Sequence, residues 1–318
     1  MTTEAETTEW LLDGDPAIRW QVMRDLLDEP AAVWERERRR TLDEGWVAAL
    51  LTFQDSNGEW PKGRWTDSTW TLLLLVALGL PEEHAAARGP IERLLGRFMP
   101  EEAEVDQAFL LKRVDLCHPA FWLGLAAHFL PADPRLPGLG AAVLSAQLAD
   151  GGWNCHVWNH PETHHGSFHT TLNVLENVRV AVERGVVPAT AFRKVELAAA
   201  EFLLAHRLYR SDHTDEVIST RFTELSYPWH WHYTVLRGLD YLRLTPAIAD
   251  GRLDDPVDLC LRSAVRTGAG RYRSASREHC LWRWRSPDRR AAGTRCARYA
   301  FSAPDPDRHR FGGARSAG

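Results

Sequence analysis

The chain has 318 residues, of which 44% are hydrophobic and 25% charged, and its formal net charge is −5. This composition allows a large buried core, whereas the acidic N-terminus lacks the apolar segment of a signal peptide. The longest apolar run, residues 72–80, is too short to span a membrane, and five scattered cysteines are too few for a disulfide framework. We therefore expect a cytoplasmic protein whose cysteines are free thiols or metal ligands.

The first predicted element is an amphipathic helix that begins at Asp15 and Pro16. An aspartate is a frequent helix N-cap, and proline is favoured at the first helical position. The apolar stripe of this helix consists of Ile18, Val22, Met23 and Leu26. Farther along, helical stretches alternate with turns rich in Gly, Pro, Asp and Asn, and no segment keeps the period of two that a sheet requires. The sequence predicts an all-α fold.

Two turns share the pattern Gln-x-x-x-Gly-x-Trp, at residues 54–60 and 147–153. Each follows an apolar helix and precedes another, which indicates an internal repeat. The glycine ends one helix in a left-handed turn, while Gln and Trp tie the turn to the neighbouring helix pair. We predict that Trp60 and Trp153 occupy equivalent positions on the same rim of a ring of helix pairs.

The second helix of each pair begins with a polar turn and continues with apolar residues. These inner helices are predicted at residues 68–78, 117–129, 167–178 and 231–242. Such helices place reactive groups at one rim of a cavity and apolar side chains along its wall. A cavity of this kind suits a long apolar ligand.

The Gln-x-x-x-Gly-x-Trp turns resemble the repeat signature of squalene and oxidosqualene cyclases. The aliphatic residue of the fuller signature is present as Leu50 and Val143, whereas Ala49 and Ala142 replace its aromatic residue. The resemblance covers about residues 45–245. It implies an α/α toroid over residues 1–261, including an N-terminal helical segment and incomplete at its C-terminal end. The Asp-x-Asp-Asp acid motif of the squalene-hopene type is absent.

The same superfamily contains the β subunits of protein prenyltransferases, which two stretches resemble. One is residues 114–117 followed by a Phe-Trp pair, and the other is the Gly-Gly-Trp turn leading to residues 168–170. The resemblance implies that Asp115, Cys117 and His169 bind Zn²⁺, a metal that accepts carboxylate, thiolate and imidazole ligands. The other interpretation is that Cys117 is a small buried hydrophobe and Asp115 a helix N-cap.

Eleven of the 14 histidines lie between residues 117 and 232. Four of them fall in residues 155–165, a stretch that suits a metal-binding loop, a lid or an adventitious metal site. The aromatic segment 227–233 contains two more, His230 and His232. If both belonged to one helix they would point to different sides, so we choose His232 as a general acid or base. The alternative is a rim histidine bonded to a carbonyl. Asp115 is the second candidate catalytic residue.

Several of the 14 tryptophans are candidates for the wall of an apolar pocket, since their π faces tolerate apolar and cationic groups. The alternative is that they belong to the core. The predicted substrate-binding residues are Trp65, Trp70, Trp122, Trp231 and Tyr233.

The segment 262–318 differs in composition from the rest of the chain. It contains 14 arginines, no lysine and only four acidic residues, and Val265 and Leu281 are its only Val, Leu or Ile residues. It is therefore a basic surface patch, a solvated tail or a stretch translated out of frame. We favour the last, because the segment cannot continue the apolar periodicity of the preceding repeats.

These features together predict an isoprenoid-handling enzyme of the prenyltransferase or terpene-cyclase type. Its expected partners are an apolar isoprenoid-type small molecule and, peripherally, a membrane surface, but no nucleic acid. The alternative is a non-catalytic α/α repeat module that binds a lipid or a protein partner.

Overall fold

The computed structural model describes residues 4–61, 67–99, 114–224 and 226–266. Within these ranges the secondary structure is helical, and the only β pairing is an isolated bridge between Arg210 and Val217. The predicted all-α class is therefore confirmed for this part of the chain. None of the described helices combines the length and apolarity that a membrane span requires.

The N-terminal helices are α1 (Glu4–Leu12), α2 (Pro16–Asp25), α3 (Ala31–Arg40) and α4 (Gly45–Leu51). Asp15 is the N-cap of α2, as predicted, and its Oδ1 accepts a hydrogen bond of 2.8 Å from the Ala17 amide. Its Oδ2 accepts the Trp46 amide at 2.9 Å. One carboxylate thus caps α2 and fixes the start of α4 beside it.

The repeat region begins with α5 (Ser68–Leu78), α6 (Ala85–Phe98), α8 (Cys117–Phe129) and α9 (Leu136–Ser145). It continues with α10 (Phe168–Glu183), α11 (Ala189–Ala205), α12 (Val235–Leu242) and α13 (Asp254–Arg266). The 3-10 helices are η1 (Cys155–Trp158), η2 (Thr220–Thr223), η3 (Pro246–Ala249) and η4 (Gly251–Leu253).

Three of the four predicted inner helices are present close to their predicted bounds, as α5, α8 and α10. The fourth prediction placed its start four residues too early. Thr234 caps α12 by accepting the Arg237 amide at 3.3 Å, so residues 231–233 precede the helix. His230 and His232 both precede α12, so the argument from helical spacing does not apply to them.

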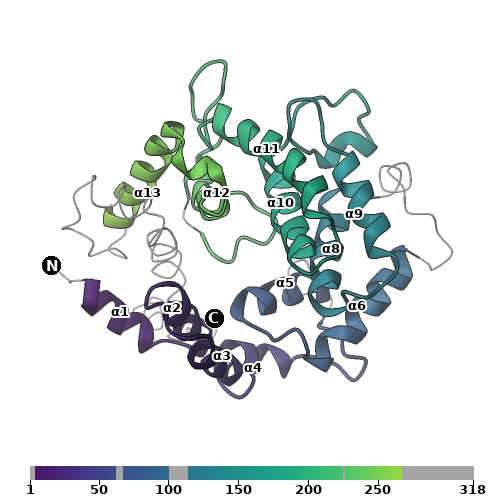
Figure 1. Ribbon diagram of the computed structural model, residues 1–318, viewed down its shortest axis with the longest axis vertical. Coiled ribbons are helices and arrows are strands. Elements are labelled where there is room, and N and C mark those ends of the chain that lie inside the picture. Colours follow the sequence, from purple (N-terminus) through teal and green to yellow (C-terminus); the bar gives the residue numbers. More distant parts are fainter. Residues whose placement is uncertain (1–3, 62–66, 100–113, 225, 267–318) are drawn as a thin grey trace, which may run out of the picture.

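Helix α8 lies at the centre of the fold. It is apolar on every side, and 11 of its residues are buried. Helix α10 packs directly against it, because Gly124 has no side chain: a Cβ at that position would come within 2.1 Å of Asn177 Oδ1. Figure 1 shows the helices following one another roughly in chain order along an arc from α1 to α13, and the α8–α10 pair lies on the side of this arc away from α1 and α13.

The two predicted repeat turns have the same hydrogen bonds. The indole N–H of Trp60 donates to the Leu50 carbonyl at 2.8 Å, and that of Trp153 donates to Val143 at 2.9 Å. Leu50 and Val143 are the aliphatic positions of the repeat signature. The glycines, Gly58 and Gly151, have positive φ angles of 75° and 90°.

The glutamines of the two turns are equivalent as well. Gln54 Nε2 donates to the Gly58 carbonyl at 2.6 Å and to Ala86, in α6, at 2.7 Å. Gln147 Nε2 donates to the Gly151 carbonyl and to Val195, in α11, each at 2.8 Å. Each glutamine thus closes its own turn and ties it to a later helix. The local equivalence of the two turns is confirmed, whereas their position on the same rim of a ring stays a prediction.

The predicted division at residue 261 falls inside α13, which continues to Arg266. Residues 267–318 lie outside the described residues, so the nature of the arginine-rich segment stays a prediction.

Candidate functional site

The N-terminal ends of α5, α8 and α10 meet at one place, next to the segment 227–234 that precedes α12. Trp70 of α5 packs edge-on against Phe121 of α8, with ring centroids 5.2 Å apart. The His230 ring lies 5.9 Å from the same indole. Three segments far apart in sequence therefore contribute rings to one aromatic group.

A second set of rings lies at the start of α10 and is connected to the first through the adjacent residues His230 and Trp231. His169 lies edge-on to Trp231, with centroids 4.9 Å apart, and 5.9 Å from His232, which stacks on Trp231. His169 Nδ1 accepts the Tyr233 amide at 2.8 Å. Burial, with smaller effects of neighbouring cations, lowers the pKa of His169 to about 4 and also lowers the pKa of His232. Both imidazoles are neutral at pH 7.

A buried arginine holds the segment 227–234 in place. The Arg237 side chain is 3% exposed, and its Nε donates to Glu176 of α10 at 3.0 Å. Its other nitrogens donate to Asn173 Oδ1 at 2.8 Å and to the His232 carbonyl at 3.0 Å. Asn173 Nδ2 donates in turn to the Trp231 carbonyl at 3.0 Å. The position of Trp231 and His232 therefore depends on α10 and α12 together.

A pair of thiols lies beside this aromatic group. Cys117, the first residue of α8, has its Sγ 2.6 Å from the Sγ of Cys155 in η1. The hydrogen bond from Cys155 lowers the pKa of Cys117 in spite of burial. The pKa of Cys155 is raised, because its proton is held by the Cys117 sulfur and because the thiol is buried. The pair therefore loses its first proton more readily than its second.

The three residues implied as zinc ligands are engaged elsewhere. Asp115 Oδ1 accepts the indole N–H of Trp158 at 2.7 Å, Cys117 contacts Cys155, and His169 Nδ1 bonds the Tyr233 amide. Among the described residues, no three His, Cys, Asp or Glu side chains meet in a way that could hold a metal ion. Asp115, Cys117 and His169 do not form a ligand set in this arrangement. Zinc binding stays a prediction.

The predicted substrate-binding residues have different surroundings. Trp70 and Trp231 belong to the aromatic group just described. Trp122 is buried and stacks on Phe98 with centroids 4.5 Å apart, while Tyr233 is 1% exposed and donates to the Leu208 carbonyl. These two side chains are core, as the alternative interpretation held for the tryptophans. Trp65 lies outside the described residues.

Sequence reasoning missed Phe121, Asn173, Arg237 and Cys155 as partners in this region. Arg237 carries no local signal of its burial, because helical spacing puts it on the same polar side of α12 as Asp240. Cys155 belongs to the His-rich stretch 155–165. Nothing in the local sequence around residue 155 indicates that its partner is 38 positions away.

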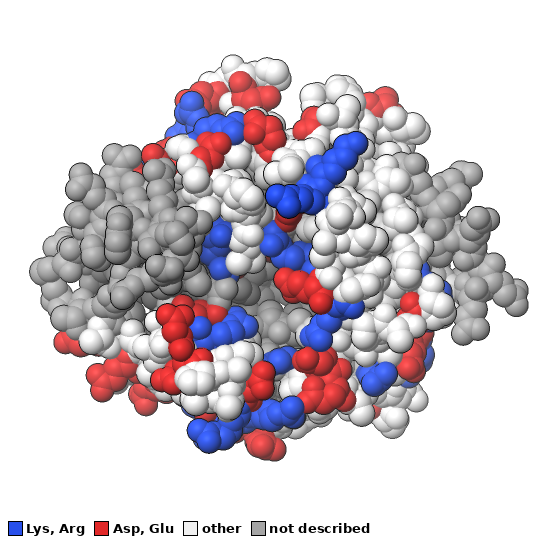
Figure 2. Space-filling view, in the orientation of Figure 1, with Lys and Arg blue, Asp and Glu red and all other residues white. Residues whose placement is uncertain are grey.

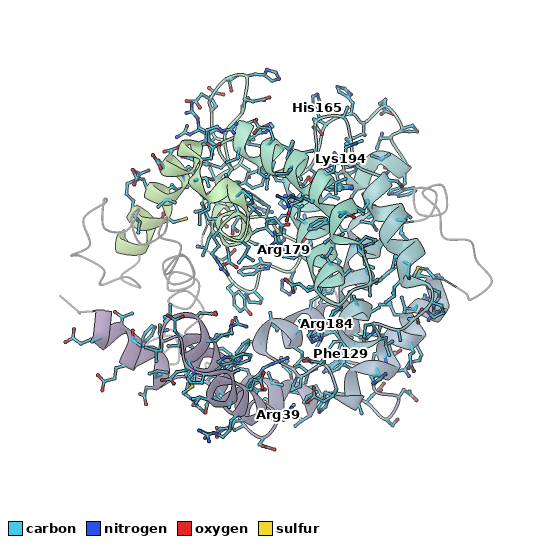
Figure 3. The ribbon with its side chains drawn as sticks, in the orientation of Figure 1. Arg39, Phe129, His165, Arg179, Arg184 and Lys194 are labelled. Carbon is cyan, nitrogen blue, oxygen red and sulfur yellow. The ribbon has the colours of Figure 1, made fainter. Side chains whose placement is uncertain are left out.

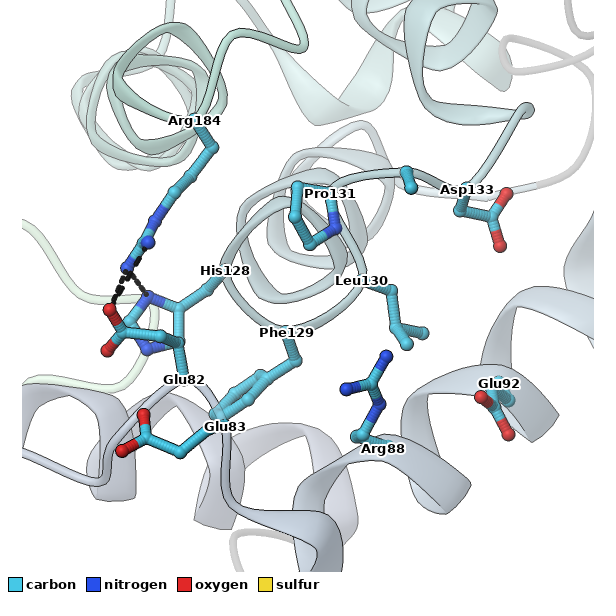
Figure 4. Close-up of a pocket in the computed structure, with 11 residues that line it drawn as sticks. Glu82, Glu83, Arg88, Glu92, His128, Phe129, Leu130, Pro131, Asp133 and Arg184 are labelled. Carbon is cyan, nitrogen blue, oxygen red and sulfur yellow. Dashed lines mark hydrogen bonds and ion pairs between the residues drawn. The ribbon is translucent and has the colours of Figure 1, made fainter.

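The opposite end of α8 borders a pocket of about 440 Å³ (Figure 4). Arg184 donates to Glu82 Oε1 at 3.3 Å, and Arg38 donates to the other oxygen at 3.2 Å. Burial would raise the pKa of Glu82, but its backbone hydrogen bond and the two arginines outweigh this effect and lower it to about 2. Burial and then the charge of Arg184 lower the pKa of His128 to about 4. This pocket is therefore lined by fixed charges.

The face shown in Figure 2 is hollowed at its middle, and side chains of both signs stand around the hollow. Figure 3 places Arg179 of α10, and Arg184, the residue that follows α10, near this region. Arg179 pairs with Glu196 and lies 4.4 Å from the centre of the Tyr241 ring. Both arginines thus have partners on other segments, so the charges at this part of the hollow are paired.

Comparison with known proteins identifies no relative. No family model matches the sequence, and neither the curated proteins nor the solved structures include a match.

Proposed function

We propose that the chain is an α/α toroid that binds an apolar, isoprenoid-type small molecule at the partly exposed rings of Trp70, His230 and Trp231. The observation that carries this proposal is the pair of hydrogen-bonded Gln-Trp turns, which link successive helix pairs as the cyclase-like repeat signature implies. The aromatic group supplies π faces at the shared end of the inner helices. A long apolar ligand would extend from these rings along the apolar helices.

A chemical step at this site would use His232. Its lowered pKa leaves the imidazole neutral at pH 7, which is the form that accepts a proton. The stacked Trp231 ring and the Arg237 bond to the His232 carbonyl hold it in place. We propose His232 as a general base; a catalytic role for Asp115 and a peripheral contact with a membrane rest on the resemblance alone.

Ligand binding is tested with farnesol, followed by isothermal titration calorimetry. We expect Trp70→Ala and Trp231→Ala to weaken binding about tenfold or more, equivalent to about 1.4 kcal/mol, because each removes a π face from the group. Trp10→Ala is the matched control, since Trp10 is an exposed tryptophan of α1. Titration with unbranched dodecanol tests whether the site prefers a branched isoprenoid chain. Absence of farnesol binding, or equal losses in all three folded variants, would refute the proposal.

The alternative is a non-catalytic α/α module that binds a lipid or a protein partner. It is favoured by the engagement of Asp115, Cys117 and His169 with other protein groups. Metal analysis of freshly purified protein separates the two. About one zinc per chain, lost in Cys117→Ala, supports a prenyltransferase-like enzyme. Protein without stoichiometric metal supports the module.

A further inference from the structure

We propose that Cys117 and Cys155 form a reversible dithiol–disulfide site, in which the disulfide fastens the loop containing η1 to the start of α8. The two sulfurs, 2.6 Å apart, are closer than the ~3.5–4.0 Å at which non-bonded heavy atoms usually pack. This inference does not depend on the proposed function, because it requires only the positions of the two thiols.

The surrounding hydrogen bonds keep the thiols opposite each other. The Cys117 amide donates to Cys155 Sγ at 3.3 Å, and the Thr170 hydroxyl donates to the same sulfur at 3.2 Å. The Cys155 amide donates to Thr170 Oγ1, also at 3.2 Å. Thr170, in the first turn of α10, therefore holds both the backbone and the sulfur of Cys155 against α8.

A second contact fixes the other end of η1. Trp158, its last residue, donates from its indole N–H to Asp115, two residues before Cys117. The loop is thus held by Thr170 at Cys155 and by Asp115 at the other end of η1. Little movement is needed for a sulfur–sulfur bond to form, so neither backbone segment has to be rebuilt.

Among the described cysteines, Cys117 and Cys155 are the two that are placed to form this disulfide. Cys260, the third of these, is buried on α13 and makes no sulfur contact with the other two. Cys155 is partly exposed, so an oxidant in solution reaches the pair from the side of Cys155. The two sulfurs are in contact, so whichever is oxidised first has the other as its resolving thiol.

The oxidant in the proposed reaction is a peroxide. One sulfur of the pair, as thiolate, attacks one peroxide oxygen; the O–O bond breaks, and that cysteine becomes a sulfenic acid with release of one water. The other sulfur then attacks the oxidised sulfur and displaces its oxygen as a second water. The two cysteines lose two electrons and two protons, hydrogen peroxide gains both, and one S–S bond forms. An added dithiol reverses the reaction by exchange.

The disulfide should change the loop more than the rest of the fold. His156, His160 and His165 lie exposed between the thiol pair and α10. With η1 covalently joined to α8, local opening of this loop becomes rarer, and proteolytic cleavage within residues 156–165 should slow severalfold. The thermal midpoint should rise by several °C, because the link closes a long loop in the unfolded chain.

The test is performed on the full chain, treated with a small excess of hydrogen peroxide. Remaining thiols are alkylated, and the protein is digested without reduction for mass spectrometry. We expect a linked peptide pair containing Cys117 and Cys155, two hydrogens lighter than the separate peptides, which dithiothreitol converts back to two alkylatable thiols. Cys155→Ser should abolish this pair, and Cys260→Ala, the matched control, should retain it.

Peptide mapping of the unsubstituted chain decides the outcome even where a variant does not fold. The proposal is overturned if Cys117 and Cys155 both remain alkylatable while peroxide is consumed. It is equally overturned if either links to another cysteine, or if either accumulates as sulfinic acid, since an adjacent resolving thiol would have intercepted the sulfenic acid.

Discussion

At the scale of single residues, Arg237 illustrates how a buried charge organises the site. Its guanidinium is almost fully buried and is satisfied by a carboxylate, an amide oxygen and a backbone carbonyl. The fork geometry of arginine serves these partners together, which a lysine could not do. The side chain therefore links α10 and α12 to the segment that contains Trp231 and His232.

We expect Arg237→Ala to lower the free energy of unfolding by about 2–4 kcal/mol, since it leaves Glu176 and Asn173 without their partner. Arg252→Ala is the matched control. Arg252 also forms carboxylate pairs, with Glu201 and Asp250, but at a more exposed position, and its loss should cost less than about 1 kcal/mol. Urea unfolding measures both. Similar losses in the two variants would contradict the role assigned to Arg237.

His128 makes stability depend on pH. Its pKa is about 4 in the folded protein, against about 6.5 for an ordinary histidine, because of burial and the charge of Arg184, with Glu82 opposing. Between these values the unfolded chain binds a proton that the folded chain does not, so the free energy of unfolding falls as the pH drops from 6.5 to 4. Above pH 6.5 this contribution is fully present.

Replacing His128 by Gln should remove this dependence. From pH 7 to pH 4.5, the variant should lose about 2 kcal/mol less unfolding free energy than the native chain. His213→Gln serves as control, because the His213 ring is exposed. Urea unfolding at the two pH values is the measurement, and equal acid sensitivity in H128Q and the native chain would contradict the prediction.

At the scale of elements, the Gln-Trp turns connect one helix pair to the next. Their tightness depends on glycine: Gly151 has a φ of 90°, and an added Cβ would lie 2.3 Å from the Ala198 carbonyl oxygen of α11. Gly185 follows α10 with a φ of 74° but has open space around it. The two glycines share a backbone conformation and differ in their packing.

Comparison of Gly151→Ala with Gly185→Ala separates backbone strain from steric exclusion. Gly185→Ala should lower the free energy of unfolding by about 1–2 kcal/mol, the usual penalty when a residue with a Cβ adopts a left-handed conformation. Gly151→Ala should cost about 3 kcal/mol or more, because α11 must also move away from the turn. Thermal or urea unfolding tests this order. If the two substitutions lower the free energy of unfolding equally, the small size of Gly151 is not what allows α11 to pack against the turn.

At the scale of the whole molecule, the helices follow an arc, and the α8–α10 pair forms the part of it that lies away from α1 and α13 (Figure 1). The described part ends with α13, which α12 and η4 contact. The arginine-rich segment beyond it offers few apolar side chains for burial, and unpaired guanidinium groups are costly to bury.

A chain ending at Arg266 should therefore unfold at nearly the same temperature as the full chain. A chain ending before Val235 should not fold, because it lacks α12 and the Arg237 bonds that hold the site. Thermal unfolding of the three chains is the measurement. If the first truncation lowers the midpoint by more than ~5 °C, about 1–2 kcal/mol of packing belongs to the removed segment and the out-of-frame interpretation fails.

The sequence by itself determined the elements whose signals are local. The N-cap Asp15, the apolar runs of α5 and α8, and the Gln-x-x-x-Gly-x-Trp turns follow from capping, periodicity and the freedom of glycine. The bonds of Trp60 and Trp153 to Leu50 and Val143 span ten residues, so they recur wherever the pattern recurs.

Only the tertiary structure decided the composition of the candidate site. No local pattern predicts that α12 starts at Val235. Nor does one relate the segments joined by the contact of Cys117 with Cys155 and by the bond between Asp115 and Trp158. Such contacts depend on how α8 and α10 pack, and that packing depends on the absence of a side chain at Gly124. The residue types for a metal site were visible in the sequence; their actual partners were set by the three-dimensional packing of the helices.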